Sequence, residues 1–247
     1  QGTNAGVVCL VGETCVQGLC QALTCPELGN GYRWVHPSPV SVYTSPLDID
    51  VVAPGLVWGV GGDGMILASA DGGASWCLQR SNVHLKLQGV DFVDPMHGWI
   101  VGESGTILAT SDGGLTWSPQ SSGTTAHLRG VAFASVTQGL AVGESGTILL
   151  TNDGGANWTA ASSTVADILN DAAWGDGQHA WAVGSVGYNG RVVATTDAGL
   201  SWSQQFSGTP SKLLAITSVS ATNAWAVSAG TLVRTTNGGS TWAVSGS

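Results

Sequence analysis

The sequence predicts an all-β protein, a five-bladed β-propeller built from four-stranded blades. Three observations lead to this prediction: one motif recurs five times, its copies are evenly spaced, and turn-forming residues are abundant. The chain of 247 residues contains 37 Gly and 11 Trp, and only 9% of its residues are charged. Because abundant Gly and small hydroxyl residues suit short strands and tight turns, we expect few helices.

The repeated motif reads Ser/Thr-x-Asp-Gly-Gly-x-Ser/Thr-Trp and is clearest at 110–117. Its Asp carboxylate can accept hydrogen bonds from backbone N–H groups of its own turn, and its glycines can take positive φ. The Ser or Thr before the Trp adds a local hydrogen bond, and the Trp ring inserts between neighbouring sheets. We interpret the motif as a self-capped hairpin turn. The five turn residues are Asp71, Asp112, Asp153, Asp197 and Asn237.

The spacing of the motif predicts how the strands are arranged. Its tryptophans, at positions 76, 117, 158, 202 and 242, lie 41, 41, 44 and 40 residues apart. Periods of about 40 to 45 residues with several short strands are typical of propellers. In the second unit we expect strands at 89–93, 98–101, 106–110 and 117–121, from innermost to outermost. Because one blade cannot bury both faces of its sheet, we expect the blades to pack face to face and close into a ring.

A second set of large apolar residues occupies the second strand of each unit. We expect these residues to form the core between blades rather than stacking platforms for a sugar. They are Trp58, Trp99, Leu140, Trp181 and Trp225.

Both ends of the chain offer an outermost strand, at 34–43 and 241–247. Either a strand closes the ring in the last blade, or the N-terminal strand begins an incomplete sixth blade, which is the alternative architecture. Prolines at 37 and 39 indicate an edge strand. We divide the chain into a cysteine-rich segment, 1–30, and a propeller, 31–247.

The cysteines favour disulfide bonds. Four of the five lie within the first 25 residues without a Cys-x-x-Cys pair, so zinc is the weaker interpretation. The fifth replaces a small residue of the other repeats, and a bond from the N-terminal segment, for instance from position 25, would clamp that segment to the first blade. The odd number leaves one thiol free or bonded to another chain, which would allow self-assembly. The cysteines are Cys9, Cys15, Cys20, Cys25 and Cys77.

Charge and hydropathy argue against nucleic-acid binding and against a transmembrane segment. A net charge of −9 with only seven Lys and Arg argues against binding to nucleic acid. No apolar run approaches the ~18 residues of a transmembrane segment. Because the cysteines indicate an oxidising compartment and the chain starts at Gln1, we expect a removed leader and a secreted or cell-surface location.

The motif resembles the Asp-box (BNR-type) repeat of sialidase-like proteins. Over about 47–247, the longer pattern Gly-x-x-Gly-x-Ile-x-x-Thr-x-Asp-Gly-Gly-x-Thr-Trp is similar to the photosystem II assembly and stability factor family. The resemblance implies a propeller fold and says less about function. That family uses seven blades and a basic patch to hold a membrane-protein precursor, whereas this chain has five units and scattered arginines, so we do not expect the same partner. The cysteine-rich segment resembles segments of secreted bacterial proteins. Two boxes depart from the pattern, at Ala198 and Asn237.

Polar residues are expected to surround the central pore on one face. Some belong to turns between the second and third strands, and the others precede the innermost strands. Converging oxygens of this kind would suit Ca²⁺, but we expect no cofactor and no metal. The predicted pore-mouth residues are Asp48, Asp63, Gln88, Glu103, Arg129, Glu144 and Asn170.

The leading hypothesis is therefore a secreted or cell-surface, non-enzymatic module that binds a protein or glycan partner or builds an extracellular assembly. The alternative is a glycoside hydrolase, which needs two carboxyl groups about 5 to 9.5 Å apart and would use the acidic ring. No Tyr, Arg or second acid repeats at inner positions. This absence favours binding over catalysis and also disfavours sialidase activity.

Overall fold

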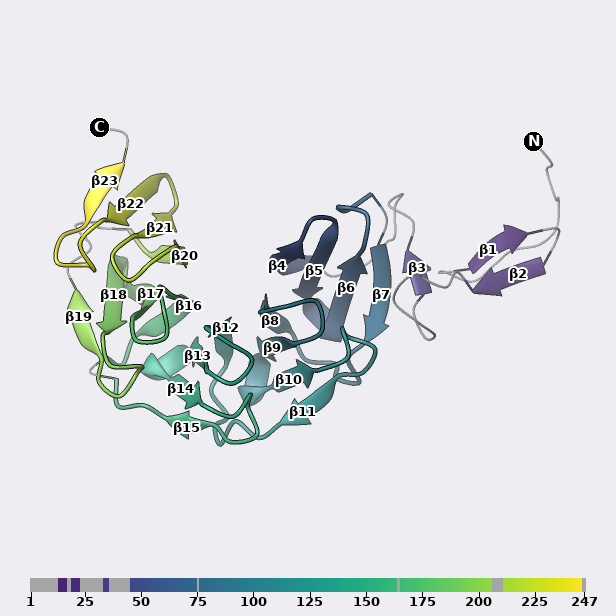
Figure 1. Cartoon of the computed structure of the whole chain (residues 1–247), viewed down its shortest axis with the longest axis horizontal. Helices are drawn as coiled ribbons and strands as arrows, with labels where there is room; N and C mark the ends of the chain where they lie inside the picture. The colour runs from purple at the N-terminus through teal and green to yellow at the C-terminus, as the bar shows by residue number, and fades with distance from the viewer. Residues whose placement is uncertain are drawn as a thin grey trace.

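The computed structural model describes residues 13–16, 19–22, 33–35 and 45–245, with gaps at 75, 164 and 206–210, and side chains from 45 onward except those of Arg80 and Ser245. It confirms the all-β prediction. Five antiparallel sheets follow one another along the chain as blades of a propeller. They fan out along an arc, with the innermost strand of each blade on the concave side (Figure 1).

The strands are short and follow the chain order within each sheet. The first blade consists of β4 (Pro46–Ala53), β5 (Leu56–Gly61), β6 (Met65–Ser69) and β7 (Trp76–Arg80); the second of β8 (Leu87–Phe92), β9 (Gly98–Gly102), β10 (Ile107–Thr110) and β11 (Ser118–Gln120); the third of β12 (Leu128–Phe133), β13 (Gly139–Gly143), β14 (Ile148–Thr151) and β15 (Thr159–Ala160); the fourth of β16 (Ile168–Trp174), β17 (Ala180–Val186), β18 (Asn189–Thr195) and β19 (Ser203–Gln205); the fifth of β20 (Leu213–Ser218), β21 (Ala224–Ser228), β22 (Thr231–Thr235) and β23 (Ala243–Ser245). The predicted strands of the second blade agree with these bounds within two residues.

Helical structure in the described residues is limited to three 3-10 turns. They join the second and third strands of the first three blades: η1 (Gly62–Gly64), η2 (Glu103–Gly105) and η3 (Glu144–Gly146). None of the described helices has the length and apolarity that a membrane crossing would require.

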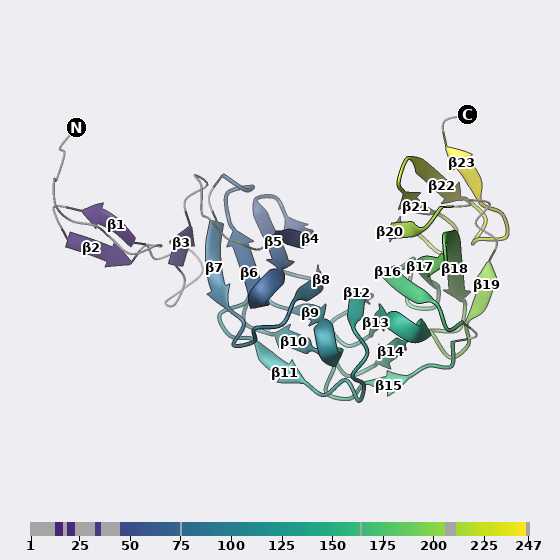
Figure 2. The same cartoon turned by 180° about the vertical axis from the view of Figure 1, so that it is seen from behind.

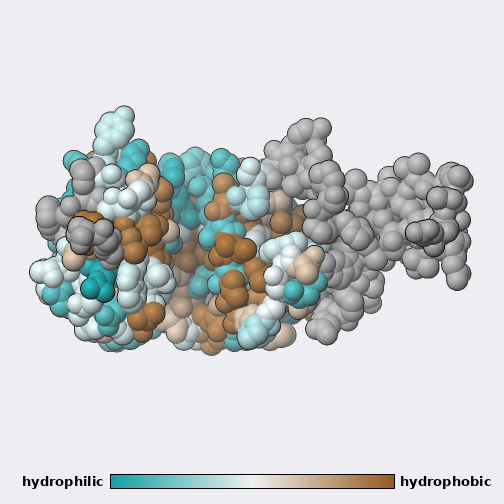
Figure 3. All heavy atoms as spheres, turned by 90° about the horizontal axis from the view of Figure 1, so that it is seen from above, coloured by the Kyte–Doolittle hydropathy of each residue, from teal (hydrophilic) through white to brown (hydrophobic). Residues whose placement is uncertain are grey.

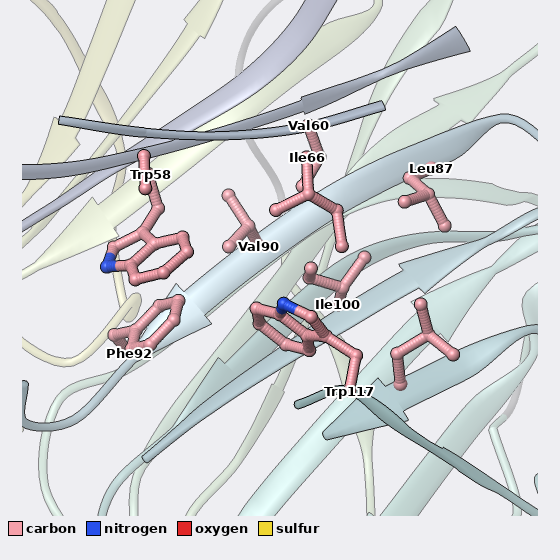
Figure 4. Close-up of a cluster of buried hydrophobic side chains, with 10 residues drawn as sticks. Trp58, Val60, Ile66, Leu87, Val90, Phe92, Ile100 and Trp117 are labelled. Atoms are coloured by element: carbon pink, nitrogen blue, oxygen red, sulfur yellow. The ribbon is translucent and has the colours of Figure 1, made fainter. Parts of the chain in front are cut away.

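Apolar side chains from facing sheets form one core cluster at each junction between blades. At the first junction, Trp58 stacks on Phe92 with ring centroids 4.5 Å apart and meets Trp117 edge-on at 6.0 Å (Figure 4). Trp58 comes from the first blade, and the other two rings come from the second. The predicted placement of the second-strand tryptophans in the core is thus confirmed at this junction.

The Asp-box turns have the predicted geometry. Asp112 accepts hydrogen bonds from the backbone N–H of Thr116 at 2.9 Å and from its hydroxyl at 2.6 Å. The hydroxyl of Thr110 adds a bond that the sequence analysis did not foresee, because it donates to Asp112 and accepts from the N–H of Gly114. The two boxes that differ from the motif keep this arrangement. Ala198 takes a φ of 60°, and the Asn237 amide stands in place of the carboxylate.

Replacing Asp112 by alanine is expected to lower the free energy of unfolding by ~1 to 3 kcal/mol, because the turn loses its local acceptor. Binding at the central cavity should be unchanged, because the bonds of Asp112 stay within its own turn. Chemical denaturation combined with a binding assay checks both points. A variant that is as stable as wild type but has lost its ligand would show that the box is a binding site.

A glutamine three residues after the box Trp joins consecutive blades, which the sequence analysis missed. The indole N–H of Trp117 donates to Gln79 Oε1 of the first blade at 2.8 Å, and that of Trp158 donates to Gln120 of the second blade at 3.0 Å. The signal was the pattern Trp-x-x-Gln in three of the five repeats. In the third repeat the position is Ala161, and the next box tryptophan bonds within its own turn instead.

Of the two candidate end strands, the C-terminal one lies where it was expected and the N-terminal one does not. β23 completes the last blade by pairing with β22. β3 (Arg33–Val35) pairs with β7 and makes the first sheet five-stranded. The N-terminal strand therefore neither closes the ring nor begins a sixth blade, because it adds to the outer edge of the first blade.

The predicted closure into a ring is wrong for this structure. Each inner strand packs against the next, from β4 through β8, β12 and β16 to β20, but β20 and β4 are not joined in this way. From both sides the arc is open between the first and last blades (Figures 1 and 2). The sequence does not reveal the open arc, because the strands of the terminal blades have the same apolar alternation as those of the interior blades.

The N-terminal segment contains a hairpin of β1 (Glu13–Val16) and β2 (Leu19–Ala22), in which Cys15 and Cys20 are cross-strand neighbours. Cys77 is buried and disulfide-bonded. The side chains of the other four cysteines lie outside the described residues, so the pairing with Cys25 and the separate N-terminal domain stay predictions.

Candidate functional site at the centre of the arc

One residue from each blade points to the axis of the arc, because every innermost strand contains a bulge after its first or second residue. A bulge inserts one extra residue and turns its side chain out of the regular alternation. The five bulge side chains line one cavity of about 440 Å³. They are Leu47, Gln88, Arg129, Asn170 and Leu214. The ring is polar on the three middle blades and apolar on the two terminal ones.

Four predicted site residues are brought together here. Asp48, Gln88, Arg129 and Asn170 line the cavity, as do four residues that the sequence analysis missed. Of the latter, one is acidic and three are apolar. The missed residues are Leu47, Asp171, Leu214 and Ala215.

Arg129 links the cavity to a fifth predicted residue. Its Nη2 lies 2.8 Å from Glu144 Oε1 and its Nη1 lies 3.4 Å from Asn170 Oδ1. The side chains of Arg129 and Glu144 are each 32% exposed. This partly buried pair holds the guanidinium at the cavity wall.

The other two predicted acids do not line the cavity. Glu103 lies 3.8 Å from Lys86 Nζ, and the exposed Asp63 lies 3.5 Å from His84 Nδ1. The acids of these two turns therefore contact a nearby basic side chain, Lys86 or His84, and stay outside the cavity. Among the described residues, no group of three His, Cys, Asp or Glu side chains could hold a metal ion.

Four aspartates of the inner strands bridge neighbouring blades. Asp48 accepts from the backbone N–H of Val90 on the second blade at 2.9 Å, and Asp171 accepts from that of Ile216 on the fifth blade at 2.8 Å. Asp50 and Asp91 do the same two residues further along the strand, to Phe92 and Phe133. These carboxyl groups satisfy backbone donors of inner strands that have no ladder partner on that side.

Burial between the blades raises the pKa values of these carboxyl groups, and the bridging hydrogen bonds partly oppose the rise. Burial raises the pKa of Asp91 to about 7, with a further contribution from the charge of Asp50. Burial also raises the pKa of Asp171 to about 7, against the hydrogen bonds from Ile216 and Ala172, which lower it. The pKa of Asp48 is raised by burial as well. Near neutral pH the cavity wall therefore carries fewer negative charges than its composition indicates.

The arrangement suits recognition more than bond cleavage. Amides of Gln88 and Asn170 both donate and accept, Arg129 donates, and two leucines supply apolar contact. The carboxyl groups of Asp48 and Asp171 already accept two backbone N–H bonds each. A carboxyl fixed in this way is less available to transfer a proton to a substrate.

The fold and the cavity together define an Asp-box β-propeller with a polar site at its centre. The sequence profile of the family described as photosynthesis system II assembly factor YCF48 matches residues 78–159 and 123–246, more than half of the chain. The chain belongs to this family. No curated protein sequence matches the chain.

Solved structures with similar folds come from several classes. A structure titled "YCF48 bound to D1 peptide" is 19% identical with a TM-score of 0.59, covering 88% of this chain and 86% of that chain. The GH74 enzyme of Niastella koreensis is 14% identical with a TM-score of 0.63, covering 81% of this chain but 38% of that chain. A chain of a nidogen/laminin complex is 13% identical with a TM-score of 0.64, covering 81% of this chain and 78% of that chain. At these identities the likeness concerns the fold alone.

Proposed function

We propose that this protein is a non-enzymatic binding or assembly module, secreted or displayed at the cell surface, that holds an extended segment of a protein partner at its central cavity. The observation that carries the proposal is the ring of bulge side chains, with polar groups on the middle blades and leucines at both ends. Membership of the YCF48 family and the D1 peptide named with one of its structures support a polypeptide over a glycan as the ligand.

The chemistry of the ring fits a peptide. A peptide backbone offers one donor and one acceptor per residue, and the side-chain amides of Gln88 and Asn170 can meet both. Arg129 can add a charge-assisted bond to a carbonyl or carboxylate oxygen. Leu47 and Leu214 face the same cavity and offer contact to an apolar side chain.

Peptides that bind the protein can be selected from a random displayed library on the immobilised full chain. Their affinity for the Arg129→Met variant should be at least about tenfold lower than for wild type, because a charge-assisted hydrogen bond is removed. Arg234→Met is the matched control, because Arg234 is an exposed arginine of β22 outside the cavity, and this variant should bind like wild type. Selected peptides that bind Arg129→Met as tightly as wild type would contradict the proposed site.

A glycoside hydrolase is the second candidate function. The observation that favours it is a pair of carboxyl groups, Asp48 and Asp171, in one cavity, both with raised pKa. Their backbone bonds argue for a structural role. A panel of chromogenic glycosides should therefore show no turnover by wild type, whereas hydrolysis that is lost in Asp171→Asn would reverse the order of the two candidates.

A further inference from the structure

The two ends of the arc expose faces that every other blade buries. We call the face of the first blade that points away from the second blade the leading face, and the face of the last blade that points away from the fourth the trailing face. Figure 3, seen from the side of the opening, shows hydrophobic residues exposed between the two ends. On the leading face, Ile49 and Val51 are 60% and 66% exposed. On the trailing face, Val227 and Leu232 are 40% and 37% exposed.

These residues occupy the positions that form the internal junctions. By strand register, Ile49 and Val51 correspond to Val90 and Phe92 of the second blade, which are 6% exposed. Trailing-face residues Val227 and Leu232 correspond in the same way to the buried Val101 and Ile107 of the second blade. Both faces therefore carry the apolar positions of a junction without a partner blade.

The two faces are also complementary to each other. At the first junction, Trp58 packs on Phe92 and Trp117. Trp225 takes the place of Trp58 on the trailing face. Val51 and Trp76 take the places of Phe92 and Trp117 on the leading face. If the trailing face packed on a leading face, Trp225 would meet Val51 and Trp76. This arrangement would repeat the contact of Trp58 with Phe92 and Trp117 at the first junction.

Charge adds a specific pair. On the trailing face Arg234 is exposed and stands where the other blades carry an apolar side chain, such as Leu150 in the third. Leu150 lies against the box of the following blade, since a Cβ added to Gly199 would come within 2.7 Å of Leu150 Cδ2. The box that follows in a trailing-to-leading contact is that of the first blade, which contains Asp71. Arg234 of one copy would therefore lie beside that box in the next copy, where its long side chain can extend toward the Asp71 carboxylate.

We propose that copies of this chain associate head to tail, with the trailing face of one copy on the leading face of the next and Arg234 paired with Asp71 across the contact. A second copy is the occupant because one chain carries both halves of the matched set, in the register of its own internal junctions. Such a heterologous contact builds closed rings or open chains of subunits.

The contact is weaker than an internal junction. Pro46 replaces the leucine that is fully buried at the start of the other inner strands, such as Leu87. Ser245 stands where Gln79 holds the tryptophan of the following blade. The association therefore lacks one buried side chain and one hydrogen bond, and it is reversible and dependent on concentration.

Sedimentation velocity of the full chain, up to about 0.1 mM, tests the proposal with two blocking variants. Val51→Glu blocks the leading face and Val227→Glu blocks the trailing face, so each variant alone should be a monomer. An equimolar mixture should form a one-to-one dimer and nothing larger, because each partner retains one intact face. The mixture also shows that both variants are folded, since a misfolded chain could not restore association.

Two further variants sharpen the result. Leu200→Glu is the control, because Leu200 is an exposed leucine in the box turn of the fourth blade, and this variant should associate like wild type. Arg234→Glu should raise the dissociation constant at least about tenfold through repulsion by Asp71. A wild-type chain that stays monomeric overturns the proposal. So does a single blocking variant that still associates like wild type, which would indicate a symmetric contact through one face.

Discussion

Replacing Trp99 by alanine should lower the free energy of unfolding by about 3 to 5 kcal/mol, the range for removal of a large buried aromatic side chain. Trp99 is 3% exposed at the junction of the second and third blades. Its ring stacks on Phe133 with centroids 3.5 Å apart, and its indole N–H donates to the carbonyl of Gly154 at 2.9 Å. The variant loses the apolar contact and leaves that carbonyl with one bond fewer.

Trp225→Ala is the matched control for this prediction. Trp225 holds the same register position in the last blade but is only partly buried, because no other blade of the described structure packs on that face. In dilute protein its replacement should cost clearly less, about 1 to 2 kcal/mol. Equilibrium denaturation of both variants decides the matter. Equal losses would mean that burial between blades is not what makes the tryptophan position important.

Raising the pH from 5 to 8 should lower the free energy of unfolding by about 2 to 4 kcal/mol. Asp91 and Asp171 have a pKa near 7 in the folded chain instead of 3.8, because burial disfavours their charged forms. Between these values the folded state binds more protons than the unfolded state, so stability falls as the pH rises. The rise in pKa sets an upper limit of about 4 kcal/mol per group, and contact of these carboxyl groups with solvent reduces it.

Denaturation at several pH values checks this prediction, with Asp91→Asn as the test variant. The asparagine oxygen can still accept from Phe133, but the side chain does not ionise, so the loss between pH 5 and 8 should shrink. Asp63→Asn removes an exposed carboxylate and should keep the wild-type dependence of stability on pH.

Below pH 4 the dependence is the opposite, and stability falls as the pH falls. Hydrogen bonds from Ser201 and Thr195 lower the pKa of Asp197 to about 2, so its turn loses its charged acceptor only in strong acid. If the free energy of unfolding of the wild-type protein did not change between pH 5 and 8, the raised pKa values of Asp91 and Asp171 would be contradicted.

The fold was predictable because each repeat encodes its own turn and its own anchor. The Asp box fixes the hairpin, and the spacing of about 41 residues between tryptophans fixes four strands per blade. Closure of the ring was not predictable. Ile49 and Val51 have the alternation of a buried strand although no blade covers them. The two-residue alternation of apolar side chains identifies which face of a strand packs, but it does not show whether a neighbouring blade covers that face.

The cavity was predicted in part for a similar reason. Gln88, Arg129 and Asn170 stood out because they are polar at the start of an apolar strand. Leu47 and Leu214 hold the equivalent bulge positions, but a leucine there looks like any strand residue. Asp171 was missed although it shares its register with Asp48. Glu103 was included because a repeated acid drew attention, whereas its local cation, Lys86, decides where it points.

The open arc also determines how cooperatively the molecule unfolds. In a closed ring every blade has two neighbours, whereas here the terminal blades have one each, and the array behaves as a linear chain of nearest-neighbour couplings. Fraying then begins at an end. The first blade has a fifth strand, β3, along its outer edge, and its Cys77 is disulfide-bonded. The last blade has neither support among the described residues, so it is the end from which local opening spreads inward, one junction at a time.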